Sequence, residues 1–188
     1  ALVKAALAHV QFETFHPFLD GNGRVGRLLI ALLLHHDGVL RQPLLYLSLY
    51  FKQNRSEYYR LLDSVRTTGD WESWLDFFLE GVAQTATGAV DTAHRLLAMF
   101  EHDAERIQGL GRAAANALRV FDALRRRPVA GIDHLARRTG IAYPTAARAV
   151  DALVGLGVLR ELTGRQRGRV FAYDGYLAIL KEGAQPLP

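Results

Sequence analysis

The 188-residue sequence contains no cysteine, which excludes disulfide scaffolds and thiolate metal sites. It also lacks long apolar runs: the longest, Leu28–Leu34, is far shorter than the roughly 20 residues that a membrane-spanning helix needs. No secretory signal opens the chain. These absences predict a cytoplasmic protein without a membrane partner.

Internal repeats and low-complexity segments are absent as well, and the composition is that of a globular protein. Apolar residues make up 49% of the chain and charged residues 22%, which excludes a disordered or fibrous protein. The charge is uneven, because residues 1–111 carry a net charge of −3 whereas residues 112–173 carry +8, all of the positive charge being arginine. This asymmetry indicates two domains, the second facing nucleic acid.

Apolar residues in the first part recur at helical spacing. The predicted helices cover Leu2–Thr14, Val25–His36, Glu57–Arg66 with Ser56 as N-cap, and Trp71 to Ile107 as one very long helix or two in line. Leu44–Phe51 fits either a helix or a strand. Because the chain lacks an initial methionine and opens within a helix, we expect a fragment of a longer polypeptide.

The second part, which begins after Gly109 and Gly111, has shorter predicted elements than the first. Helices are predicted at 113–126, 132–139 and 143–156, followed by short strands at 158–162 and 169–173 that a glycine-containing turn joins. A helix, a helix-turn-helix and a β-hairpin in this order form a winged helix-turn-helix pattern.

The stretch from His16 to Arg27 contains the residue types that phosphate chemistry needs. The turn of Gly21, Asn22 and Gly23 directly precedes an apolar helix, so backbone N–H groups and the positive end of the helix dipole form an anion cradle. Arg24 and Arg27 lie three residues apart, on one helix face. Asp20 is an oxygen ligand of the kind that Mg²⁺ uses together with phosphates, and His16 is a base that titrates near neutral pH.

These parts together indicate a phosphoryl or nucleotidyl transfer site. No lysine follows the glycines, which excludes a Walker A loop, and no strand precedes them, which excludes a dinucleotide-binding fingerprint.

The stretch reads His-Pro-Phe-Leu-Asp-Gly-Asn-Gly-Arg-Val-Gly-Arg and resembles the Fic motif, HPFx(D/E)GNGRxxR, with every specified position filled. The similarity extends over residues 1–108. The resemblance implies a mainly α fold, with a Fic-type helical bundle at 1–108 and a small winged helix-turn-helix domain, helices with a β-hairpin, at 112–180. It also implies a protein adenylyltransferase, which transfers AMP from ATP to a hydroxyl side chain of a target protein or of itself and releases pyrophosphate.

The resemblance further implies roles for single residues. His16 would deprotonate the target hydroxyl, Asp20 would hold Mg²⁺, and Gly21–Gly23 would form the anion hole. Arg24 would hold the β-phosphate of ATP, and Arg27 would reach the γ-phosphate.

Further residues complete the implied site. Phe18 would anchor the loop in the core, and Tyr59 and Arg66 fall where the family contacts adenine. Gly23 replaces the lysine of the related Doc-type kinases, which favours AMP transfer over phosphorylation. The family's β-hairpin flap and inhibitory helix are not found, since the segment Thr68–Ser73 fails the inhibitory signature at its last position.

The basic second part has two interpretations. Arg148 on the third helix and Arg165, Arg167 and Arg169 on the wing could contact duplex DNA. Alternatively, this domain mediates homodimerisation or target docking, and its arginines are simply solvated. The corresponding alternative function is a winged-helix DNA-binding regulator whose Fic part only senses nucleotide.

Overall fold

The computed structural model describes residues 1–41 and 46–182, which divide into two compact units. The first unit covers Ala1–Val90 and the second begins at Asp91. The predicted domain limits of 1–108 and 112–180 stay a prediction. The fold is mainly α with one small sheet, as the sequence predicts. Within the described residues, no helix is both long and apolar enough to span a membrane.

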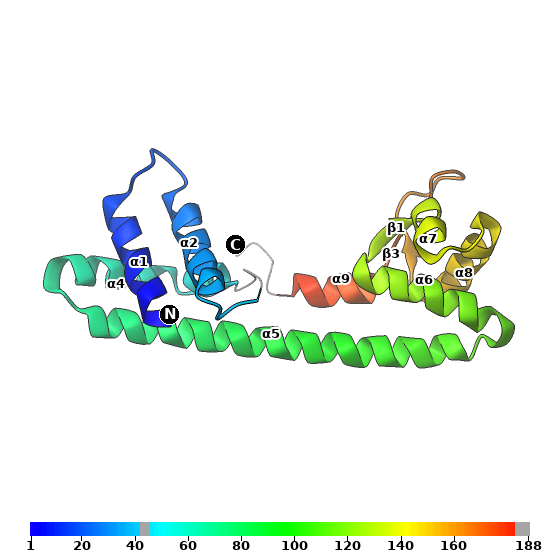
Figure 1. The fold of residues 1–188 in the computed structure, drawn as a ribbon, viewed down its shortest axis with the longest axis horizontal. Helices are drawn as coiled ribbons and strands as arrows, with labels where there is room; N and C mark the ends of the chain where they lie inside the picture. Colours follow the sequence, from blue (N-terminus) through cyan, green and yellow to red (C-terminus); the bar gives the residue numbers. More distant parts are fainter. Residues whose placement is uncertain (42–45, 183–188) are drawn as a thin grey trace. The chain divides into compact units, whose positions relative to one another are not determined.

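The first unit is built on a helical hairpin of α1 (Leu2–Phe15) and α2 (Asn22–His36), which lie side by side and are joined by the loop 16–21 (Figure 1). The short helix α3 (Leu47–Gln53) and helix α4 (Arg55–Thr68) follow. Helix α5 (Trp71–Gln108) begins in this unit and continues into the second.

The core of the first unit is largely aliphatic on α1 and α2, whereas α3 and α4 combine Phe51 and Tyr58 with the aliphatic Leu47, Leu61 and Val65. Trp74 and Phe78 are fully buried and pack against Phe51. Tyr58 is buried whereas the neighbouring Tyr59 is exposed. The hairpin of α1 and α2 therefore rests on a rigid aromatic layer.

Several helix limits differ from those that the sequence predicts. Helix α2 begins at Asn22 rather than Val25, because the Gly-Asn-Gly segment forms its first turn. Helix α4 begins at Arg55 with Asn54 as its N-cap, so the predicted cap at Ser56 is wrong. The first two residues of the element predicted at Leu44–Phe51 lie outside the described residues, and the structure describes a helix from Leu47 to Gln53.

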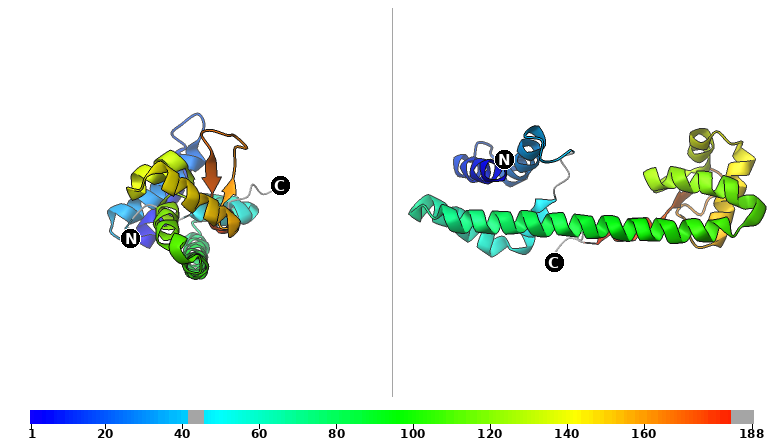
Figure 2. Two further views of the ribbon diagram at one scale, coloured as in Figure 1. Left: turned by 90° about the vertical axis from the view of Figure 1, so that its right-hand side faces the viewer. Right: turned by 60° about the horizontal axis from the view of Figure 1, so that its bottom comes forward.

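The second unit is a winged helix-turn-helix with a third strand that the sequence analysis missed. The small helix η1 (Gly111–Ala113) leads into α6 (Ala114–Arg126), α7 (Ile132–Thr139) and α8 (Tyr143–Gly155). The antiparallel sheet has the order β1 (Val129–Gly131), β3 (Val170–Ala172), β2 (Arg160–Glu161), and α9 (Asp174–Lys181) follows. The β2–β3 connection projects from this unit as a wing (Figures 1 and 2).

Candidate functional site: the loop between α1 and α2

His16 ends helix α1 in a left-handed conformation, with φ 46° and ψ 56°. It is the single non-glycine residue with a positive φ in the described parts of the chain. Its backbone N–H donates to Phe12 O at 3.0 Å, and its side chain is exposed. A non-glycine residue in this region carries strain of about 1–3 kcal/mol, and such strain gathers at functional sites. The backbone thus singles out the histidine that the sequence proposes as the base.

Asn22 holds the loop together. Its side chain is buried, accepts a hydrogen bond from Phe18 N at 2.9 Å and donates one to Phe18 O at 2.5 Å. The Asn22 amide is therefore engaged with the protein, and only its backbone N–H is left for the anion hole. The first hydrogen bonds of α2 are accepted by Gly21 O from Arg24 and Val25, each at 3.0 Å. The N–H groups of Asn22 and Gly23 thus precede the helical bonding pattern, as at any helix N-terminus.

Phe18 is the clearest departure from the expected loop. Its side chain is 52% exposed and contacts only the edge of the core, through Phe12 at a ring-centroid distance of 6.2 Å. The loop is anchored by the backbone of Phe18 rather than by its ring. The expectation that the ring anchors the loop in the core is wrong.

Each of the two arginines lies against one of the two loop glycines. A Cβ atom added at Gly21 would lie 3.3 Å from Arg24 Nη2, and one at Gly23 would lie 3.0 Å from Arg27 Nη1. Gly21 also has a φ of 81°, which glycine adopts without strain. Because glycine has no Cβ atom, both guanidinium groups can lie close to the backbone at the start of α2.

Asp20 lies at the same end of α2 and is exposed. Its Oδ1 accepts from Gly21 N at 2.6 Å, and its Oδ2 lies 3.6 Å from Arg24 Nη2. Within residues 1–41 and 46–182, no three His, Cys, Asp or Glu side chains gather as a metal site. A single carboxylate suits Mg²⁺ only when phosphates and water supply the other ligands, which is the usual manner of Mg²⁺ binding with nucleotides. The residues present fit that mode.

Beneath the loop lies a buried polar group that the sequence analysis missed. His9 is fully buried, stacks on both Phe51 and Trp74, and shares a 2.8 Å hydrogen bond between its Nε2 and Tyr58 Oη. Burial, with a smaller contribution from the Arg27 charge, lowers the pKa of His9 to about 4, although the hydrogen bond with the Gly26 backbone opposes the shift. His9 is therefore neutral at physiological pH. The only sequence signal was a histidine on the apolar face of the first helix.

Glu13 lies one turn after His9 and closer to the loop. Its Oε1 is buried without a hydrogen-bond partner among the described residues, and a Cβ at Gly26 would lie 2.5 Å from it. Burial raises the pKa of Glu13, while the charges of Arg27 and His16 oppose that rise. The carboxyl group of Glu13 thus interacts electrostatically with both His16 and Arg27.

The residues expected at adenine are both exposed on α4. Tyr59 is 54% exposed and lies under the Arg55 guanidinium at 5.7 Å. Arg66 forms an ion pair with Asp63 at 2.8 Å. Within the described residues neither makes a hydrogen bond, ion pair or ring contact with residues 16–27, so their role stays a prediction.

The four arginines expected at DNA lie in three different settings. Arg148 is exposed on α8, and Arg165 and Arg167 are exposed on the wing. Arg169 lies at the base of the wing, where its Nε donates to Glu161 at 3.0 Å and its Nη1 lies 3.3 Å from Asp151. The charge of Arg169 is thus paired within its own domain, and the wing presents two arginines rather than three.

Comparison with known families defines both parts of the chain. Residues 1–34 match the model of the Fic/DOC family, and residues 113–163 match that of the IclR helix-turn-helix domain. The chain is therefore similar to the Fic/DOC family over residues 1–34 and to the IclR helix-turn-helix domain over residues 113–163, which confirms the Fic resemblance and the helix-turn-helix that the sequence predicts.

Curated relatives add a finer comparison. Proteins named "Protein adenylyltransferase Fic" from Drosophila grimshawi, Drosophila erecta and Drosophila virilis are each 38% identical to this chain over 81 residues. That region is 43% of this chain but only 15% of the length of each relative. The chain thus spans about one seventh of the length of these relatives, which their names describe as adenylyltransferases.

Proposed function

We propose that this protein transfers AMP from ATP to a hydroxyl side chain of a protein. One observation carries the proposal: the loop that joins α1 to α2 begins at the strained His16 and leads to the two arginine–glycine pairs at the N-terminus of α2. This end of a helix favours phosphate groups, and a base lies on the same loop. The relatives named as adenylyltransferases support the same reaction class.

In the proposed reaction, His16 accepts the proton of a serine, threonine or tyrosine hydroxyl. The hydroxyl oxygen forms a bond to the α-phosphorus of ATP, and the bond from that phosphorus to the bridging oxygen breaks, so that pyrophosphate leaves. The N–H groups of Asn22 and Gly23 stabilise the charge that develops on phosphate oxygens, because they are fixed before the reaction. Arg24 and Arg27 hold the leaving pyrophosphate.

Asp20 would hold Mg²⁺ at this site. The ion, when bound, neutralises phosphate charge and favours departure of pyrophosphate. The other contributions come from the chain itself: the helix N-terminus, the two guanidinium groups and the imidazole. Tyr59 and Arg66 are proposed for adenine, with the protein target entering at His16.

The proposal is tested by labelling acceptor proteins with ATP that carries ³²P at either the α- or the γ-phosphate, in the presence of Mg²⁺. The α-label is expected on protein and the γ-label is not. His16→Ala should abolish the label, whereas His94→Ala, which removes an exposed histidine on α5, should leave it unchanged. Transfer of the γ-label, or transfer that survives His16→Ala, would contradict the proposal.

A second candidate function is a DNA-binding regulator whose Fic part senses nucleotide without turnover. The match to the IclR helix-turn-helix domain favours it. Saturable ATP binding with no label transfer to any acceptor would support the sensor and reject the transferase. Duplex DNA is proposed as a partner in either case, through Arg148 on α8 and the two exposed arginines of the wing.

A further inference from the structure

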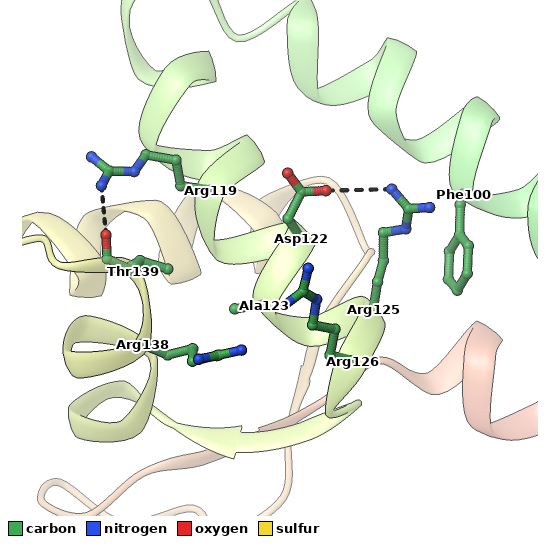
Figure 3. Close-up of a pocket in the computed structure, with 8 residues that line it drawn as sticks. All are labelled: Phe100, Arg119, Asp122, Ala123, Arg125, Arg126, Arg138 and Thr139. Atoms are coloured by element: carbon green, nitrogen blue, oxygen red, sulfur yellow. Dashed lines mark hydrogen bonds and ion pairs between the residues drawn. The ribbon is translucent and has the colours of Figure 1, made fainter.

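The second unit contains an open hollow that is lined largely by arginine (Figure 3). Its volume is about 760 Å³, and its lining comes from α6, α7 and one residue of α5. Pockets that bind small molecules usually measure about 300–1,000 Å³. Helix α8 and the wing contribute no residue to the described lining. The hollow is therefore separate from the side chains that are proposed to contact DNA.

Two of the four arginines that line the hollow are held by the protein. Arg119 Nη2 donates to Thr139 O at 2.5 Å, at the C-terminal end of α7. Arg125 lies 3.4 Å from Asp122 and covers the Phe100 ring at 4.8 Å (Figure 3). These contacts fix one side of the hollow and its one aromatic face.

The other two arginines have no such partners. Within the described residues, Arg126 of α6 and Arg138 of α7 make no hydrogen bond or ion pair, and Figure 3 shows both extending into the same space from the two helices. Asp122, the one acidic residue in the lining, is already paired with Arg125. Two unpaired like charges beside one hollow repel each other, and a bound anion would relieve that repulsion.

The chemistry of the side chains narrows the class of anion. A guanidinium group is a planar fork that binds two oxygen atoms of one phosphate at once. The two unpaired guanidinium groups of Arg126 on α6 and Arg138 on α7 therefore match two phosphate groups better than one. The guanidinium of Arg125, which lies over the Phe100 ring, adds a third positive charge beside the hollow.

We infer that this hollow binds a small molecule that carries at least two phosphate groups. Arg126 and Arg138 bind the phosphates, while Arg119 and Arg125 supply further positive charge and shape. The site lies entirely within the second unit and does not depend on the proposed transfer of AMP.

The experiment is calorimetric titration of the whole chain with inorganic pyrophosphate, at constant ionic strength and without divalent ions. Because the loop of the first unit is itself proposed to bind pyrophosphate, the titration is made in an Arg24→Ala/Arg27→Ala background. One pyrophosphate per chain is expected to bind there. Adding Arg126→Ala and Arg138→Ala should weaken binding about tenfold for each arginine removed.

A matched control removes two other exposed arginines of the same domain. Arg112→Ala/Arg137→Ala lowers the charge equally, but neither residue lines the hollow. This pair should change the affinity less than about threefold, since it acts only through screened long-range charge. In the loop-variant background, amide NMR spectra should show pyrophosphate-induced shifts at Ala123 and Thr139. Without ligand, the spectra should show an unchanged fold in every variant.

Four results would overturn the inference. The first is no saturable binding of pyrophosphate in the loop-variant background. The second is an equal loss of affinity in the control pair, which would indicate general charge attraction. The third is equal affinity for sulfate, inorganic phosphate and pyrophosphate, which would indicate a site for any small anion. Displacement of pyrophosphate by duplex DNA, with loss of DNA binding in Arg126→Ala/Arg138→Ala, would assign the hollow to DNA instead.

Discussion

Acidification from pH 7 to pH 5 is expected to destabilise the first unit through His9. Its pKa is about 4 in the folded protein, against 6.5 for an unperturbed histidine. As the pH falls, the unfolded chain binds a proton near pH 6.5 while the folded protein does not until about pH 4. The contribution of neutral His9 is therefore fully present above pH 6.5 and is lost as the pH falls toward 4. Between pH 7 and pH 5 the free energy of unfolding should fall by about 2 kcal/mol.

Urea denaturation at both pH values measures this loss. Trp71 and Trp74 both lie in the first unit, so their fluorescence reports its unfolding. His9→Phe keeps an aromatic ring in the stack but cannot bind a proton, so its stability should change far less with pH. Glu13, whose pKa is raised, acts in the opposite direction, and Glu13→Gln should steepen the dependence. An equal pH dependence in the wild-type protein and His9→Phe would refute the reasoning.

Three other predictions test separate parts of the structure. Arg27→Ala should weaken binding of ATP about tenfold more than binding of AMP, measured by calorimetry, because only ATP carries the phosphate that Arg27 is proposed to meet; equal weakening contradicts that role. Gly81→Ala places a Cβ 2.4 Å from an aromatic ring carbon and should lower stability by about 1–3 kcal/mol, whereas Gly88→Ala meets nothing within 4 Å and should raise it by up to about 1 kcal/mol in thermal unfolding. Arg165→Ala/Arg167→Ala should weaken binding to every DNA duplex alike and reduce the salt slope by about two contacts; a change confined to one sequence would count against backbone contacts.

Most helices could be predicted because their apolar residues keep one period over many turns. The pattern from Trp71 onward predicts the start of α5 and fits either one long helix or two in line, of which the structure has the former. Helices α6, α7 and α8 are likewise separated by clear breakers, such as Gly140, which has a φ of 68° at the end of α7. Long periodic segments specify their own structure, since burial of one face decides the outcome.

The missed elements are short and depend on distant partners. Strand β1 has three residues and no periodicity of its own, and it exists because Val129 pairs with Ala172 of β3. At the start of α4 the sequence predicts Ser56 as the cap, whereas the helix begins one residue earlier, at Arg55, after Asn54. Such choices are made by tertiary contacts that a single segment does not contain.

The motif located the candidate site, but only the structure shows how its side chains are used. Spacing alone places Asn22 among ligand-binding residues, whereas its amide binds the backbone of Phe18. The equal spacing of Arg165, Arg167 and Arg169 likewise gives no indication that Arg169 is paired with Glu161. The buried His9 was missed because its position on the apolar face of the first helix does not reveal its partners Phe51, Tyr58 and Trp74, which lie far away in the sequence.

The most direct test of the proposed function is intact-mass analysis of this protein and of hydroxyl-bearing acceptor proteins after incubation with ATP and Mg²⁺. The account predicts a mass increase of one adenylyl group on an acceptor or on the protein itself, with equimolar release of pyrophosphate. The increase should be absent in His16→Ala and with an ATP analogue whose α–β bridge cannot be cleaved. An increase by a phosphoryl group, or unchanged masses while the protein is saturated with ATP, would contradict the account.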